Sequence, residues 1–146
     1  MEECLFFSIA ADTALFGRQH FISCIVRFSF DSSTLEIPLF ICSCAVASGK
    51  ELAVLIFEKL IERNARFDKF VSVATDGAAN MVGKFNGLSA HLKMLVHHHC
   101  RSNNIIAPTI HSMWCFAHRI NLVTRAFLAI KPVNIVLAFS DWFSKR

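Results

Sequence analysis

The chain has 146 residues, of which 54% are hydrophobic, and a formal net charge of +4. This length suffices for about one domain. The hydrophobic fraction is high, but no apolar stretch of about 18 residues runs without charged or strongly polar side chains, which excludes a transmembrane helix. Glu2 and Glu3 stand where a secretory signal carries bases, so we expect a chain of the nucleus or the cytoplasm that is not secreted.

The charge is distributed unevenly. Residues 1–76 contain seven Lys or Arg against ten Asp or Glu, and residues 77–146 contain eight Lys or Arg against Asp141 alone. A basic C-terminal half indicates a surface that faces phosphates, although a solvated basic face without a ligand explains it almost as well.

Three apolar runs come first in the chain, over residues 4–11, 21–30 and 35–47. Turn-forming residues separate them, so we predict an antiparallel meander of three strands. The six cysteines follow neither a disulfide spacing nor a C-x-x-C pattern, which predicts reduced and mostly buried thiols. They are Cys4, Cys24, Cys42, Cys44, Cys100 and Cys115.

Helices and strands alternate in the rest of the chain. Residues 50–66 place Leu52, Ile56 and Leu60 on one side of an amphipathic helix that is long enough for a crossover. A strand over residues 70–75 should therefore lie parallel to an earlier strand. The remaining expected elements are a helix over 88–97, a strand over 109–114, and helices over 119–129 and 133–143. This order predicts an α/β fold with a five-stranded mixed sheet, three strands antiparallel and then two parallel, with flanking helices.

Two acids, Asp12 and Asp76, each stand at the end of an apolar run. If the two strands are parallel neighbours, both carboxylates emerge side by side at one edge of the sheet. Such a pair can hold Mg²⁺ or Mn²⁺ for two-metal phosphoryl transfer. The alternative is that each Asp only caps the turn or helix that follows it.

Three pieces of sequence carry a resemblance to a known family: the strand ending at Asp12, the run V-A-T-D-G-A-A-N-M-V-G over residues 73–83, and C-F-A-H over residues 115–118. Together they resemble the RNase H-like catalytic domain of hAT-superfamily transposases. Domesticated vertebrate relatives of that family include general transcription factor II-I repeat domain-containing protein 2 and BED-type zinc finger proteins. The resemblance covers nearly the whole chain and implies an ancestral metal-dependent cleavage and transfer of DNA strands, with Mg²⁺ or Mn²⁺ as cofactor.

The resemblance also assigns roles to residues. It implies that Asp12 and Asp76 match the first two metal-binding acids of the family. The residues that it places in the surrounding motifs are Gly77, Met81, Cys115 and His118.

The chain departs from the family pattern in three ways. The family's third acid is a Glu that follows a large helical insertion, whereas this chain has no Glu beyond Glu62. Asp12 is followed by Thr13 and Ala14 instead of Glu and Ser, and no BED-type finger precedes it. We therefore expect a truncated domain: residues 1–131 form a partial RNase H-like domain, and residues 132–146 start the insertion. We expect vestigial acids, no retained cofactor and no enzymatic activity.

Other functions remain open. The chain could serve as a domesticated nuclear module that binds nucleic acid or protein, it could be a transposon remnant without a function, or, least favoured, it could be a small metal-dependent nuclease. Phe139 and Trp142 are candidates for self-association. The candidate contacts to DNA are the basic side chains Lys84, Lys93, Arg119 and Arg125.

Three further site types are disfavoured. One is a zinc site, for which paired-Cys spacing is absent and a solvated helix end fits better. Its candidate ligands are His97, His98, His99 and Cys100, together with His111, Cys115 and His118. The glycines after Asp76 do not follow the Walker A spacing, which favours tight turns. Most of the 15 Phe residues fall in predicted strands and helices, as core material and not as a base-stacking platform.

Overall fold

The computed structural model describes residues 5–30, 33–44 and 48–129. These fall into two units that divide between Trp114 and Cys115. The expected start of an insertion at 132–146, with Phe139 and Trp142, lies outside the described residues. No helix in the described ranges is long and apolar enough to cross a membrane.

The first unit is built on a five-stranded sheet. Its strands are β1 (Phe7–Phe16), β2 (Gln19–Phe30), β3 (Ser33–Cys44), β4 (Phe70–Thr75) and β5 (His111–Trp114). Their order across the sheet is β3-β2-β1-β4-β5. The first three strands pair antiparallel, whereas β4 lies parallel to β1 and β5 lies parallel to β4. This confirms the predicted mixed sheet, and its strand order and directions are those of an RNase H-like fold.

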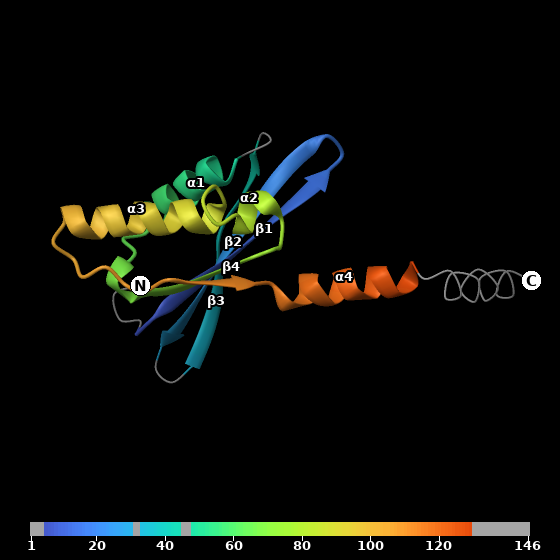
Figure 1. The fold of residues 1–146 in the computed structure, drawn as a ribbon. Coiled ribbons are helices and arrows are strands. Elements are labelled where there is room, and N and C mark those ends of the chain that lie inside the picture. Colours follow the sequence, from blue (N-terminus) through green and yellow to red (C-terminus); the bar gives the residue numbers. More distant parts are fainter. Residues whose placement is uncertain (1–4, 31–32, 45–47, 130–146) are drawn as a thin grey trace, which may run out of the picture. The chain divides into compact units, whose positions relative to one another are not determined.

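Helices α1 (Gly49–Glu62) and α3 (Leu88–Ser102) pack against each other on one face of this sheet (Figure 1). The predicted stripe of Leu52, Ile56 and Leu60 is buried there, which confirms the apolar face of α1. Ile9 and Val73 contribute from the strands beneath. The core of the unit therefore lies between the two helices and one face of the sheet.

Both long helices end in the same way. Asn64 after α1 and Asn104 after α3 adopt left-handed backbone conformations, with φ of 51° and 53°. The N–H of Ala65 then donates to the carbonyl of Leu60 at 3.0 Å, and an equivalent bond of 2.8 Å closes α3. These are Schellman caps. The expected helix ends at residues 66 and 97 were wrong because α1 stops at this cap four residues earlier and α3 runs on to Ser102.

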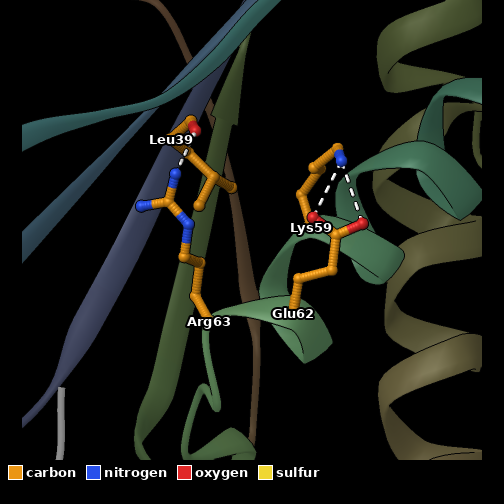
Figure 2. A network of polar contacts seen from close by, with 4 residues as sticks. All are labelled: Leu39, Lys59, Glu62 and Arg63. Carbon is orange, nitrogen blue, oxygen red and sulfur yellow. Dashed lines mark hydrogen bonds and ion pairs between the residues drawn. The ribbon is translucent and has the colours of Figure 1, made fainter.

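A β-bulge in β3 ties the sheet to the end of α1. Cys24 of β2 is paired with Phe40, but the next residue of β2 is paired with Pro38, so Leu39 has no partner on that strand. Its carbonyl instead accepts a hydrogen bond from Nη2 of Arg63 at 3.5 Å (Figure 2). The extra residue bends an edge strand, and Arg63 compensates for the interrupted ladder.

Two short helices connect the main elements, and one helix forms the described part of the second unit. The connecting helices are η1 (Phe67–Lys69), a single 3₁₀ turn before β4, and α2 (Ala79–Val82), which follows β4. The second unit contains α4 (Phe116–Leu128), which begins three residues earlier than predicted.

Candidate functional site

Asp76 is the first residue beyond β4. Its Oδ1 accepts a hydrogen bond from the N–H of Ala78 at 3.1 Å, an arrangement that turns the chain toward α2. Asp76 is half-buried. The carboxylate therefore does cap the following turn, as the simpler interpretation required, and its other oxygen accepts no hydrogen bond from any described residue.

Asp12 does not end its strand, contrary to the prediction. β1 continues to Phe16 because it pairs with β2 along its whole length, with Asp12 opposite Ser23. However, the parallel ladder between β1 and β4 ends at the pair Ala11 and Thr75. Asp12 and Asp76 are thus the next residues of two neighbouring parallel strands.

The two acids follow the last residue pair of the ladder between β1 and β4. Ala11 and Thr75 are buried beneath the helices, with 3% and 1% of their surfaces exposed. Side chains alternate along a strand, so Asp12, which lies within β1, points to the opposite face. Asp76 lies beyond the end of β4, and its carboxylate is held by the turn toward α2. Adjacent strands are about 4.8 Å apart, so the backbones of the two acids lie close together at this end of the sheet. Asp12 is exposed, and its Oδ1 accepts the N–H of Thr13 at 2.9 Å.

This donor set fits a hard divalent cation. Mg²⁺ binds through one or two carboxylates, retains several waters and takes its remaining ligands from phosphate oxygens. Among the residues that the structure describes, no group of three or more His, Cys, Asp or Glu side chains could hold a metal ion. The pair would supply at most two ligands, and a bound ion would depend on water or substrate for the others.

The segment after Asp76 is packed tightly against the helices. Met81 of α2 is fully buried in the core. A Cβ on Gly87 would lie 2.4 Å from the backbone nitrogen of Gly83, and a Cβ on Gly49 would lie 2.4 Å from the carbonyl oxygen of Asn80. Close backbone contact explains these glycines without a phosphate loop. Gly77 forms part of the turn into α2.

The other predicted residues are distributed over both units. Lys84 is exposed in the turn before α3, and Lys93 is half-buried on α3. Arg119 and Arg125 lie on α4 of the second unit. Cys115 is exposed at the N-cap position of that helix, and the side chain of His118 lies outside the described residues.

The histidine cluster at the end of α3 is divided among separate contacts. Nε2 of His97 lies 3.0 Å from the carbonyl oxygen of Pro108. His99 packs edge-on against Phe67, with ring centroids 4.9 Å apart. Cys100 is buried, and burial raises the pKa of its thiol. These side chains do not converge on a metal position, which favours the helix-end interpretation over zinc.

Comparisons with known proteins gave structural likeness only. No protein-family model and no curated protein matches the sequence. Among solved structures, the chain is similar to the HTLV-2 integrase catalytic core domain in complex with magnesium, with a TM-score of 0.37 and 10% identity over 86% of this chain and 70% of that one. It is also similar to YeaZ from Pseudomonas aeruginosa, with a TM-score of 0.35 and 10% identity over 75% of this chain and 44% of the other. At these TM-scores, the RNase H-like fold rests on the order and directions of the five strands.

Proposed function

We propose that this chain derives from a DNA transposase of the hAT type and does not cleave DNA. In contrast to the expectation from the sequence that no cofactor is retained, we propose that Asp12 and Asp76 of this chain still bind Mg²⁺ or Mn²⁺ weakly. The observation that carries the proposal is the register of β1 and β4, whose last pair is Ala11 and Thr75. This register makes Asp12 and Asp76 the next residues of two neighbouring parallel strands, at the carboxyl end of β4. The sequence motifs around Asp76 and at residues 115–118 support the hAT assignment.

The proposed loss of cleavage rests on the number of acids within these 146 residues. Two-metal phosphoryl transfer needs ligands that clamp both the attacking and the leaving oxygens. Beyond Asp76 the sequence contains a single acid, Asp141, and no Glu. With two carboxylates, the chain can bind an ion and orient a phosphate without completing the reaction. A bound ion would supply positive charge to phosphate oxygens.

Calorimetric titration of Mn²⁺ tests the metal site. Asp76→Asn removes one ligand charge and should abolish the binding that the wild-type chain shows. Asp68→Asn is the matched control because Asp68 precedes β4, at the opposite end of the strand, where it is paired with Arg66. Equal loss of binding in both variants, or no binding by folded wild-type chain, would contradict the proposal.

A plasmid-nicking assay tests the loss of activity. We expect no nicking of supercoiled DNA in Mn²⁺ by the wild-type chain. Metal-dependent nicking that disappears in Asp76→Asn would overturn the inactive assignment and leave the metal site intact.

A nuclear role as a nucleic-acid-binding module is the second candidate. It is favoured by the absence of any acid between Asp76 and Asp141, because a segment without carboxylates does not repel phosphates. Its test is binding to DNA that weakens as salt is raised.

A further inference from the structure

The turn between α2 and α3 presents an aromatic side chain to solvent. Phe85 is 75% exposed, unlike Phe7, Phe67 and Phe70, which are buried in the core. Nζ of Lys84 lies 5.3 Å from the centroid of the Phe85 ring. A cation and an aromatic face therefore stand together at the tip of one turn.

The backbone on both sides of Phe85 is held in place. The N–H of Gly87 donates to the carbonyl of Gly83 at 2.9 Å, which closes the turn. A Cβ on Gly49 at the start of α1 would lie 2.6 Å from the carbonyl oxygen of Asn86. The turn is closed by its own hydrogen bond and is packed against α1. The backbone that carries Phe85 is therefore held in one position.

The turn lies close in the chain to Asp76. From Asp76 the chain passes through the four-residue helix α2 and reaches Gly83, and helical residues advance only about 1.5 Å each. Phe85 and Asp76 therefore belong to one short connection at the carboxyl end of β4.

We propose that Phe85 stacks on an unpaired base of a DNA strand, while Lys84 contacts a neighbouring phosphate of the same strand. Single strands are bound by this combination, because every base has a π-face and every link carries a negative charge. Phe85 has Lys84 and Asn86 as its neighbours in the turn, so it is not part of an apolar run of the kind that indicates a protein interface. That the strand is DNA rests on the proposed function, whereas the stacking contact rests on the turn itself.

Fluorescence anisotropy with a labelled 20-nucleotide single-stranded oligonucleotide tests this site. The titration is done in EDTA at low salt, so that the result does not depend on metal binding. Phe85→Ala should weaken binding roughly tenfold or more. Phe6→Ala is the matched control, because Phe6 is an exposed aromatic residue just before β1 and its loss should leave the affinity unchanged.

A 2-aminopurine base in the oligonucleotide separates stacking from charge attraction. Its fluorescence should be quenched by the wild-type chain and by Phe85→Tyr, but not by Phe85→Leu.

Lys84→Met should reduce the slope of log affinity against log salt by about 0.7. Asp76→Asn should bind the strand at least as tightly as wild type, so loss of the metal site and loss of the stacking site are distinguishable.

Several outcomes would overturn the inference. These are wild-type affinity in folded Phe85→Ala, equal weakening by Phe6→Ala, and absence of quenching by the wild-type chain. If Phe85→Ala changed only the self-association of the chain in sedimentation, Phe85 would be a protein contact and the inference would be wrong.

Discussion

The two carboxylates of the proposed site are positioned by their own backbone. Asp12 accepts the N–H of Thr13 and Asp76 accepts the N–H of Ala78, each through Oδ1. These bonds restrict the side chains before any ligand arrives, and such preorganisation lowers the entropy lost on binding. Close packing also determines the reactivity of Cys24 and the tolerance of Gly49 to a side chain.

The thiol of Cys24 should be unreactive in the folded chain. Burial raises its pKa to about 12, so the reactive thiolate is about one part in 10⁴ at pH 8. N-ethylmaleimide should label exposed Cys115 and leave Cys24 free, as read by peptide mass spectrometry, and both should react in denaturant. The raised pKa also means that this thiol stabilises the fold below about pH 9 and that its contribution is lost as the pH rises toward 12. Rapid labelling of Cys24 would contradict its burial.

Gly49 should not tolerate a side chain. An added Cβ would lie 2.4 Å from the carbonyl oxygen of Asn80 and 2.6 Å from that of Asn86, both backbone atoms. We expect Gly49→Ala to lower the free energy of unfolding by about 1–3 kcal/mol in urea denaturation. Lys50→Ala, at the exposed next residue, is the control and should change little. A fully stable Gly49→Ala would show that α1 does not press against this turn.

At the scale of elements, α1 depends on its first turn. Ser48 and Glu51 form a capping box: the N–H of Glu51 donates to Oγ of Ser48 at 3.3 Å, and the N–H of Ser48 donates to Oε2 of Glu51 at 2.7 Å. The second bond lowers the pKa of the Glu51 carboxyl. Such a cap satisfies two donors at the end of a helix that buries its apolar stripe in the core.

Ser48→Ala should therefore destabilise the fold by about 1 kcal/mol. Ser48→Asp keeps an acceptor at the N-cap and should retain most of the stability. Thermal unfolding followed by circular dichroism compares the two variants. Equal melting temperatures for wild type and Ser48→Ala would show that the cap does not contribute.

The types of the elements could be predicted from the sequence more reliably than their ends. A 3.6-residue period located α1, and an apolar β-branched run located β4. The end of α1 depends on the left-handed conformation of Asn64, which the apolar pattern does not encode. β1 extends past Asp12 because β2 pairs with it as far as Gln19, a contact that an apolar run alone does not reveal.

The site was predictable only in part, for a similar reason. Two acids after apolar runs indicated a pair. The register of β1 and β4, however, depends on contacts between residues far apart in the chain, which the local sequence pattern does not encode. Phe85 was missed because Phe residues were expected to be core material. That expectation was wrong for several of them: Phe7, Phe67 and Phe70 are buried, but the exposed Phe residues are Phe6, Phe16, Phe30, Phe85, Phe116 and Phe127. For Phe85, the neighbours Lys84 and Asn86, with glycines on either side, were the available signal of an exposed turn.

For the molecule as a whole, the core and the proposed metal site use different residues. α1 and α3 cover the face of the sheet that carries Ile9 and Val73, and neither Asp12 nor Asp76 belongs to that core. Substitution of either acid should therefore leave the core intact.

Paramagnetic broadening by Mn²⁺ in an NMR spectrum of the ¹⁵N-labelled chain tests the central claim most directly. The account predicts that the amides of Thr13, Gly77 and Ala78 broaden first, and that Asp76→Asn removes the effect while the spectrum otherwise remains folded. Broadening centred on residues 97–99 would instead place the ion at the histidines of α3 and would contradict the acid pair as the metal site.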